Sequence, residues 1–538
     1  MKTKKIRCAD ALVEILKANG VKFVFGHPGE QILPFYDALR TSKIKHVLMR
    51  HEQGAAHAAD GYARSSGQMG VCLSTAGPGA LNLVMGVATA YKDSVPILVI
   101  TGDVPTDLKG GNVFQEIDIC GVFQPITLKS FDVKDSEEAV FKLKEAIEMM
   151  QYGKTGPVHL NLPKDVLLAM VDISVITENI GHFPEIDKEN ISADISNAIK
   201  LIKESERPFI IAGAGIIWAD ALMEFRKFVE TYGIPVATTY PARGIIPEGH
   251  QLSLGMIGVR GTEAANFAGK NCDVLIALGC RLSERTRKGI GNCKVIHVNL
   301  DEKSLNGNIN IQEDVLEFIR RLNDLKLRST ESWLLEIQKY SRSYCIKTDY
   351  LTVPLKPQRA IKEILDASEI NSIDSVIIND AGTHTTWVTL LKTVKNPSSL
   401  LFSGGFGPMG YAVPASVGAA VANPGKHIVA VVGDGGFQMT LQELATIAQL
   451  DLPVVVCIIN NSSLGIIKQW QDLYYEGRYE VELENPDFVK LAEAYNIVAR
   501  RVDSPGSVFK AVKKALDTKK PYLIEVVVDK EEGIPLPR

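Results

Sequence analysis

The sequence lacks a long hydrophobic run, and this absence argues against a membrane-spanning helix. No uninterrupted apolar stretch in the 538 residues reaches the roughly 18 residues that such a helix needs. The basic N-terminal stretch carries Asp10 and Glu14 where an export signal would have its apolar core, so it predicts an amphipathic helix instead. We therefore expect a soluble chain that is neither exported nor inserted into a membrane.

Closely spaced cysteine pairs and an excess of charge are also missing. The eight cysteines form no C-x-x-C motif and lie mostly inside apolar segments. This predicts reduced thiols in a cytoplasmic protein and argues against a disulfide framework or a zinc site. The net charge of −4 provides no positive field for a nucleic-acid backbone. We expect neither a nucleic-acid nor a membrane partner.

Short runs rich in β-branched residues alternate with longer helical patterns almost throughout the chain. Most runs are continuous rather than alternating, which is typical of strands buried on both faces of a parallel sheet. Polar, weakly periodic stretches near residues 172–190 and 329–358 divide the chain. The sequence thus predicts an α/β protein of three doubly wound parallel-sheet domains: residues 1–172, a Rossmann-like domain over residues 190–330, and residues 355–538.

Two neighbouring predicted strands near the C-terminus each end in a small polar side chain. Asp434 follows the run HIVAVV between glycines, and Asn461 follows the next run, with 26 residues between them. Alone, Gly-Asp-Gly is most often a turn and Asn-Asn a cap. Ligands bind beyond the carboxyl ends of parallel strands, so the two together favour a site for Mg²⁺ and a diphosphate.

This pattern resembles the thiamine diphosphate signature of thiamine-dependent enzymes. The resemblance implies that Asp434, the Asn461 side chain and the Ser463 carbonyl bind Mg²⁺. Met409, in SGGFGPMGYAVPAS, corresponds to the hydrophobic residue that bends the cofactor into a V shape. The other residues that the resemblance places at the cofactor in this region are Gly382, Thr383, His384, Gly407, Gly433, Gly435, Gly436 and Asn461.

A second segment, HEQGAAHAADGYAR, resembles the one that holds the activating glutamate of these enzymes. An acidic residue in the first turn of a helix is commonplace by itself. The resemblance implies that Glu52 bonds N1′ of the aminopyrimidine, and it places Pro78 and Asn82 of STAGPGALN beside the cofactor. In this family the two halves of a site come from different subunits, which implies at least a homodimer. We expect a tetramer.

From about residue 5 to 530 the chain resembles the large subunits of acetolactate synthase (acetohydroxyacid synthase). Phe114 and Gln115 match an active-site pair, Lys134 a lysine at the substrate entrance, and Arg285 an arginine that grips the second 2-oxo acid. Taken alone, Lys134 and Arg285 would more often be surface charges. The remaining expected pocket residues are Gly29, Glu30, Gln31, Ile466, Ile467 and Trp470, of which Trp470 matches the tryptophan that favours 2-oxobutanoate.

The resemblance implies a carboligation in the biosynthesis of branched-chain amino acids. Pyruvate would be decarboxylated and condensed with a second 2-oxo acid, giving 2-acetolactate or 2-aceto-2-hydroxybutanoate. FAD in the central domain and a small regulatory subunit are further expectations.

Departures from the family pattern leave other substrates open. Glu30 and Gln31 follow Pro28-Gly29 where the family has Pro-Gly-Gly-Ala, Asp103 replaces a glutamine, and LSER replaces FDDR. The alternatives are a thiamine enzyme acting on glyoxylate, sulfoacetaldehyde, oxalyl-CoA or an aryl keto acid, and a non-catalytic paralogue. A nicotinamide oxidoreductase is disfavoured because no G-x-G-x-x-G is followed at the right distance by an acidic residue.

Overall fold

The structure, a computed structural model, describes residues 4–177, 188–322, 326–370 and 375–536. The chain divides into two compact units. The first comprises Met1–Gly181, Thr348–Val388 and Leu401–Gly533, and the second comprises His182–Lys347, Thr389–Leu400 and Ile534–Arg538. The first unit contains two six-stranded sheets and the second contains one.

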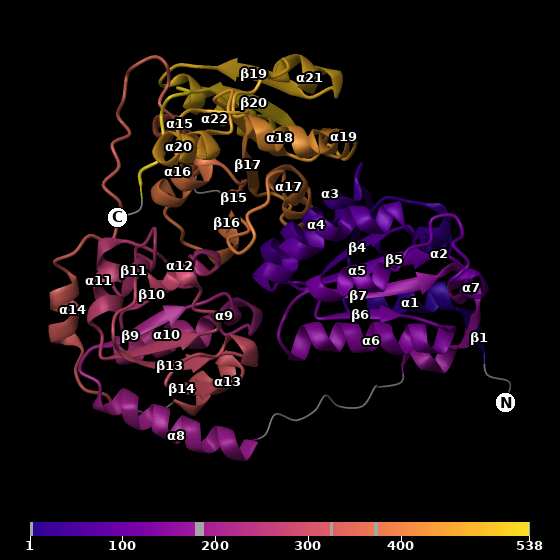
Figure 1. Ribbon diagram of the computed structural model, residues 1–538, viewed down its shortest axis with the longest axis horizontal. Helices are drawn as coiled ribbons and strands as arrows, with labels where there is room; N and C mark the ends of the chain where they lie inside the picture. The colour runs from indigo at the N-terminus through magenta and orange to yellow at the C-terminus, as the bar shows by residue number, and fades with distance from the viewer. Residues whose placement is uncertain (1–3, 178–187, 323–325, 371–374, 537–538) are drawn as a thin grey trace. The chain divides into compact units, whose positions relative to one another are not determined.

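The N-terminal sheet is parallel, with the order β3-β2-β4-β5-β7-β6. Its strands are β2 (Phe23–Gly26), β3 (Lys45–Leu48), β4 (Gly70–Ser74), β5 (Ile97–Asp103), β6 (Lys129–Asp132) and β7 (Val158–Pro163). Its main helices are α1 (Cys8–Ala18), α2 (Leu33–Thr41), α3 (Glu52–Ser66), α4 (Pro78–Asp93), α5 (Ile119–Phe123), α6 (Ser136–Tyr152) and α7 (Lys164–Leu168). Helices α3 and α4 lie on one side of the sheet and α6 on the other (Figure 1). A short antiparallel pair, β1 (Lys5–Arg7) and β8 (Met170–Asp172), joins the two ends of this segment.

The C-terminal sheet has the order β16-β15-β17-β18-β20-β19. Its strands are β15 (Ser375–Asn379), β16 (Leu400–Leu401), β17 (His427–Gly433), β18 (Val454–Asn460), β19 (Val498–Val502) and β20 (Tyr522–Val527). Its main helices are α15 (Pro357–Ser368), α16 (Thr383–Leu391), α17 (Ala412–Ala422), α18 (Asp434–Thr440), α19 (Leu444–Gln449), α20 (Gly465–Tyr474), α21 (Phe488–Ala494) and α22 (Ser507–Thr518). When the strands of each sheet are numbered from its own first strand, this sheet and the N-terminal sheet both have the order 2-1-3-4-6-5, although the sequence shows no repeat.

Helices α3 and α17 pack against each other within the first unit through residues without side chains. A Cβ atom at Gly418 of α17 would lie 1.9 Å from the carbonyl oxygen of Ala58 in α3. A Cβ at Gly61 of α3 would lie 2.3 Å from the carbonyl oxygen of Ala415 in α17. Only glycine permits such a close approach of two backbones, so these residues determine the spacing of the two helices.

The sheet of the second unit is parallel, with the order β11-β10-β9-β12-β13-β14. Its strands are β9 (Pro208–Ala212), β10 (Val236–Thr238), β11 (Ser253–Met256), β12 (Val274–Leu278), β13 (Lys294–Val298) and β14 (Ile309–Ile311). Its helices are α8 (Lys188–Glu204), α9 (Gly215–Trp218), α10 (Leu222–Tyr232), α11 (Glu263–Asn271), α12 (Glu284–Arg287), α13 (Val315–Arg321) and α14 (Glu331–Ile337). When its strands are numbered from 1 in chain order, this sheet has the order 3-2-1-4-5-6, which is the strand order of dinucleotide-binding folds.

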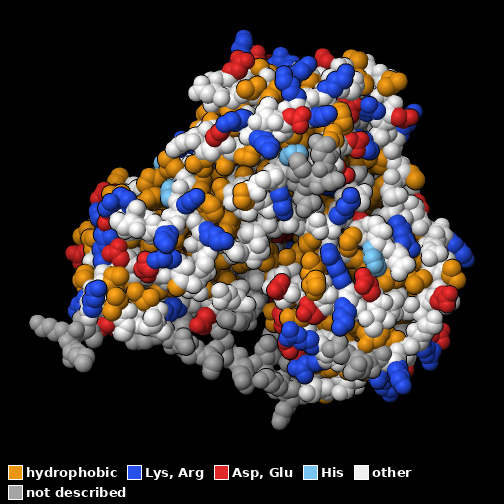
Figure 2. Space-filling model, turned by 180° about the vertical axis from the view of Figure 1, so that it is seen from behind, with side chains coloured by type: hydrophobic (Ala, Val, Ile, Leu, Met, Phe, Trp, Pro, Cys, Tyr) orange, Lys and Arg blue, Asp and Glu red, His pale blue; other side chains and the backbone are white. Residues whose placement is uncertain are grey.

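These three sheets confirm the predicted α/β class, and α1 confirms the amphipathic N-terminal helix. No helix in the described ranges combines the length and the apolar character needed to cross a bilayer. All eight cysteines are free thiols. Acidic and basic side chains are interspersed over the face shown in Figure 2, as expected for a net charge of −4.

Candidate active site

Glu52 is the first residue of α3, directly beyond the turn that follows β3. Its side chain is buried, with 8% of the residue exposed. The amide Nδ2 of Asn82 in α4 donates to Glu52 Oε2 at 2.9 Å. The structure therefore brings together two of the residues predicted for the cofactor, and it holds the Glu52 carboxylate on the N-terminal turn of a helix, where negative charge is favoured.

The turn before Glu52 is held by Glu443, which the sequence analysis did not single out. The Glu443 carboxylate accepts the backbone N–H groups of Arg50 and His51, each at 3.1 Å, and the hydroxyl of Thr446 at 3.0 Å. Burial raises the pKa of Glu443 to about 7, although the bond from the Arg50 backbone opposes this shift. Glu443 thus positions the residue next to Glu52 from the C-terminal part of the chain.

The loop after β4, residues 75–79, contacts the predicted pocket residues Gly29 and Gln31 and also Glu52. A Cβ at Gly29 would lie 2.5 Å from Cβ of Thr75, and the Gln31 N–H donates to Thr75 Oγ1 at 3.3 Å. A Cβ at Gly79 would lie 3.1 Å from Glu52 Oε1. Gly29 and Gln31 therefore contact the loop that also borders Glu52.

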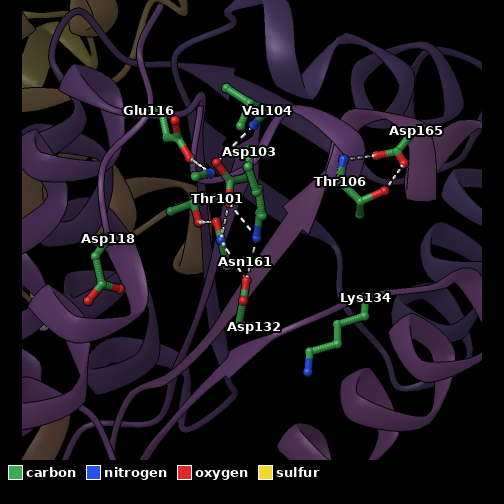
Figure 3. A network of polar contacts seen from close by, with 12 residues as sticks. Thr101, Asp103, Val104, Thr106, Glu116, Asp118, Asp132, Lys134, Asn161 and Asp165 are labelled. Carbon is green, nitrogen blue, oxygen red and sulfur yellow. Dashed lines mark hydrogen bonds and ion pairs between the residues drawn. The ribbon is translucent and has the colours of Figure 1, made fainter. Parts of the chain in front are cut away.

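Several predicted residues lie on the exposed side of this region. Glu30 is exposed and forms an ion pair with Lys164 at 3.1 Å. Pro78, the first residue of α4, is exposed, and so is Lys134. In Figure 3 the Lys134 side chain lies apart from the hydrogen-bonded group around Asn161.

Phe114 and Gln115 lie on the long connection after β5. Phe114 is 80% exposed, an unusual state for a phenyl ring. Gln115 has a φ of 66°, in the left-handed region, and its carbonyl oxygen would be 2.4 Å from a Cβ at Gly77. Because Gly77 has no Cβ, the predicted Phe-Gln pair can sit directly against the loop that borders Glu52.

Asp434 begins α18 at the carboxyl end of β17, and β17 pairs with β18 in parallel. Asn485, which the sequence analysis missed, donates its amide Nδ2 to Asp434 Oδ2 at 2.7 Å and to Asn460 Oδ1 at 3.0 Å. Burial raises the pKa of Asp434, and the bond from Asn485 acts in the opposite direction. The amide bridge orients the carboxylate at the end of the sheet.

Asn461 and Thr383 meet at Gly465. A Cβ at Gly465 would lie 2.6 Å from Asn461 Nδ2 and 3.0 Å from Thr383 Cγ2. The Ser463 carbonyl accepts the N–H of Gly465 at 2.9 Å and keeps one lone pair for a further partner. The described residues contain no group of three or more His, Cys, Asp or Glu side chains that could hold a metal ion. The polar groups that the structure shows beside the Asp434 carboxylate include the side-chain amides of Asn485 and, through it, Asn460.

His384 lies between the two predicted glycine segments. A Cβ at Gly382 would be 2.5 Å from its ring, and one at Gly433 would be 3.3 Å away. Burial lowers the pKa of His384 to about 4, so the ring is neutral near pH 7. Its Nε2 is buried and has no hydrogen-bond partner in the described part of the chain, which leaves a polar atom for a bound ligand.

Met409 lies against the glycine-rich N-terminus of α18. Its Cε would be 3.4 Å from a Cβ at Gly435. The neighbouring backbone is fixed by buried Asp380, which accepts the N–H groups of Gly410 at 2.9 Å and Ala412 at 2.8 Å. A Cβ at Gly436 would be 3.0 Å from Asp380 Oδ1. No local sequence pattern pointed to this role of Asp380.

The other predicted pocket residues lie on α20 and in the second unit. Ile466, Ile467 and Trp470 belong to α20, where Ile467 is 49% exposed. The Trp470 ring stacks on Tyr474 with a centroid separation of 5.7 Å. Arg285 is an exposed residue of α12 in the second unit. Gly407, which was predicted for the cofactor site and lies in the first unit, is exposed and has a φ of 67°.

Comparison with known proteins extends these observations over the whole chain. Residues 6–122 match the family described as thiamine pyrophosphate enzyme, N-terminal TPP binding domain, residues 195–322 match its central domain, and residues 380–526 match its C-terminal TPP binding domain. A relative from Methanocaldococcus jannaschii, named probable acetolactate synthase large subunit, is 44% identical over 98% of this chain and 93% of its own length. Acetolactate synthase large subunits from Lactococcus lactis and Haemophilus influenzae are 38% and 34% identical, over 97% and 99% of this chain and 92% and 96% of their own lengths.

Proposed function

Since the chain belongs to the thiamine pyrophosphate enzymes, and among them to the family of acetolactate synthase large subunits, we propose that it is the catalytic subunit of an acetolactate synthase. It decarboxylates pyruvate and joins the remaining two-carbon unit to a second 2-oxo acid, giving 2-acetolactate or 2-aceto-2-hydroxybutanoate. The observation that carries this proposal is the 44% identity over 98% of the chain to a protein of that name. The buried Glu52 and Asp434, each beyond the carboxyl end of a strand in one of the two sheets of the first unit, agree with it. Such similarity over the entire chain favours this reaction over those of other thiamine enzymes.

The residues around Asp434 fit a magnesium diphosphate. One carboxylate, the Asn461 amide and the Ser463 carbonyl are the hard oxygen donors that Mg²⁺ prefers, with water and phosphate oxygens completing the shell. His384 supports the same proposal, because its buried Nε2 needs a partner. Gly382 and Gly433 leave space beside that ring for the diphosphate. When bound, thiamine diphosphate supplies a nucleophilic carbon and stabilises the negative charge left by departing CO₂.

The chain's own residues hold protons and orient the reactants. Glu52 accepts or returns a proton at its carboxylate, which Asn82 keeps in one orientation. Met409, Phe114 and Gln115 supply apolar and amide surface around the reacting atoms. Lys134 and Arg285 provide positive charge for the carboxylates of the incoming 2-oxo acids, and the side chains of α20 complete the pocket with Trp470.

FAD and further subunits belong to the same proposal. The 3-2-1-4-5-6 strand order gives the central sheet a switch point between β9 and β12, the place where such sheets bind dinucleotides. A homodimer, and from it a tetramer, would cover Leu81 and Met85 of α4, which are 38% and 42% exposed. The name "large subunit" of the relatives supports a small regulatory partner.

The proposal also includes the location and the domain limits. Eight free thiols suit the reducing cytoplasm. We assign residues 1–172 to pyrimidine binding, residues 190–330 to the central domain and residues 355–538 to diphosphate binding.

Product analysis is the deciding experiment. The purified chain, with thiamine diphosphate, Mg²⁺ and FAD, is supplied with pyruvate alone and then with pyruvate plus 2-oxobutanoate. We expect 2-acetolactate in the first case and 2-aceto-2-hydroxybutanoate in the second. If neither forms while glyoxylate, sulfoacetaldehyde, oxalyl-CoA or an aryl keto acid is consumed, the substrate assignment is wrong. Glu52→Gln should keep the cofactor bound and abolish turnover, so an active variant would remove Glu52 from the mechanism.

A further inference from the structure

Three neighbouring strands of the N-terminal sheet place polar side chains side by side where they end. Asp103 is the last residue of β5, Asn161 lies on β7 and Asp132 is the last residue of β6. Because β7 runs between β5 and β6, Asn161 can reach both carboxylates. Its Nδ2 donates to Asp103 Oδ2 at 2.6 Å and to Asp132 Oδ1 at 3.2 Å (Figure 3).

Asn161 is itself fixed by a buried layer beneath it. Thr101 Oγ1 donates to Asn161 Oδ1 at 2.9 Å and lies 2.8 Å from His159 Nε2. Ser130 Oγ lies 2.8 Å from His159 Nδ1, so a neutral ring that donates to Thr101 and accepts from Ser130 satisfies every group. Burial lowers the pKa of His159 to about 3, which agrees with the neutral ring. The two carboxylates are therefore presented on a rigid base.

Lys109 closes this arrangement from the other side. Its Nζ lies 2.8 Å from Asp103 Oδ2 and 2.6 Å from Asp132 Oδ1. The Asp103 side chain is only 4% exposed and that of Lys109 only 26%. An ion pair so shielded from water is stronger than a surface pair, because the local dielectric is lower. Lys109 also provides a partner for Asp103, one of the residues that depart from the family pattern.

Lys109 belongs to residues 104–118, here named the β5–α5 loop, which carries Phe114 and Gln115. The loop has a second anchor, since the N–H and the hydroxyl of Thr106 donate to Asp165 at 3.0 and 2.5 Å. Beyond Lys109 the loop folds on itself, with the Glu116 carboxylate accepting the N–H groups of Gly110 and Val113. Lys109 is therefore the last tie to the sheet before the exposed Phe114.

We propose that Lys109 is a positioning residue: by tying the β5–α5 loop to Asp103 and Asp132, it fixes Phe114 and Gln115 for the second 2-oxo acid. The identity of the substrate in this inference rests on the proposed function. The contact of Lys109 with Asp103 and Asp132 does not depend on it. Without Lys109 the loop keeps its Thr106 anchor but loses its link to β6. Phe114 and Gln115 then sample several positions against the loop at Gly77.

The test compares Lys109→Met with Lys109→Arg and with a matched control, Lys142→Met. Lys142 belongs to α6, which packs on the same N-terminal sheet. Its side chain is 24% exposed and forms an ion pair with Glu145 at 2.8 Å, but it lies outside the β5–α5 loop. Hydrogen–deuterium exchange of residues 104–118 is measured on the full chain with thiamine diphosphate and Mg²⁺ bound. We expect faster exchange in Lys109→Met, and exchange close to that of the unchanged chain in Lys109→Arg and Lys142→Met.

Kinetics with 2-oxobutanoate varied at saturating pyruvate provide the second measurement. Misplacing reactive groups by about 1 Å can cost up to a hundredfold in rate, so we expect kcat/KM for 2-oxobutanoate in Lys109→Met to fall at least tenfold, mainly through KM. The affinity for thiamine diphosphate should not change. If Lys109→Met does not fold, Asp132→Asn replaces it, because the Asp132 side chain is 47% exposed and the substitution weakens only one of the two links.

Each outcome separates this inference from the proposed function. Unchanged exchange in the β5–α5 loop would refute the tie, whatever the substrate is. Faster exchange with unchanged kinetics would refute the link to Phe114 and Gln115. If the unchanged chain makes no acetohydroxyacid, the proposed function fails, and the exchange measurement still decides whether Lys109 holds the loop.

Discussion

Gly418→Ala is the substitution for which the structure makes the firmest stability prediction. In the interior of an ordinary helix, replacing glycine by alanine stabilises by about 1 kcal/mol. Here the added Cβ would lie 1.9 Å from the carbonyl oxygen of Ala58 and 2.7 Å from the N atom of Tyr62. Because a carbon and an oxygen atom rarely approach closer than about 3.3 Å, α3 and α17 would have to separate by roughly 1.4 Å.

That separation would loosen a tightly packed helix pair. Overpacking a filled interior typically costs about 1–3 kcal/mol, occasionally more, which outweighs the propensity gain at this site. Because the unfolding entropy is about 2.1 cal/mol/K per residue, we expect Gly418→Ala to lower the midpoint of thermal unfolding of the large first unit by about 1–4 °C. Since α3 begins at Glu52, the shift should also reduce turnover.

Differential scanning calorimetry and steady-state kinetics measure these effects. Gly249→Ala is the matched control, because a Cβ there would meet nothing within 4 Å. A Gly418→Ala protein as stable as the Gly249→Ala protein would refute the argument that the contact between α3 and α17 requires glycine.

Three further predictions concern polar groups. Asn485→Leu should weaken magnesium-dependent thiamine diphosphate binding at least about tenfold, because Asp434 loses the amide that orients it; titration at fixed Mg²⁺ would show this, and unchanged affinity would contradict it. For Glu443, the folded-state pKa of about 7 lies above the ordinary value of 4.5 for a glutamate, so its contribution to stability is present below pH 4.5 and is lost as the pH rises through 7. Glu443→Gln should remove that dependence on pH. The unfolding temperature of the variant, relative to that of the unchanged chain, should therefore rise between pH 5 and 8. A difference between the two unfolding temperatures that does not change with pH would contradict the shift. Arg243 donates to both oxygens of Glu248 at 2.6 and 3.0 Å and is 4% exposed; Arg243→Lys loses this fork and should destabilise by about 2 kcal/mol or more, which calorimetry would test.

The sheet interiors were predictable from sequence, whereas most of the edge strands, with the exception of β3, were not. Strands such as β5, β17 and β18 are buried almost throughout, so their residues form continuous apolar runs. The missed edge strands β6 and β19 read KSFD and VARRV and are half exposed, so they carry no such run. A strand that pairs on one side only can contain polar residues, and its pairing depends on a neighbour that lies elsewhere in the sequence.

The same distinction holds for the candidate site. Asp434 lies at a strand end directly after an apolar run and was therefore identifiable as a candidate, whereas Glu52 was predicted from the resemblance of its segment. Their supporting partners come from distant segments: Asn485 is 51 residues from Asp434, and Glu443 is 392 residues from His51. Lys109 was missed for a similar reason, since only the folded sheet brings Asp132 next to Asp103. Local sequence thus predicted the candidate binding groups, whereas their supporting partners became visible only in the fold.

The pairing of α3 with α17 has a consequence for the time course of synthesis. Ser66 ends the first helix and Ala412 begins the second, so 345 residues are made between them. At about 5–20 residues per second, roughly 17 to 69 seconds pass before the partner helix leaves the ribosome. Throughout that interval the small-residue face of α3, with Glu52 at its start, has no covering helix from its own chain. The N-terminal segment must therefore remain folded or protected without this helix contact until the C-terminal segment has been made.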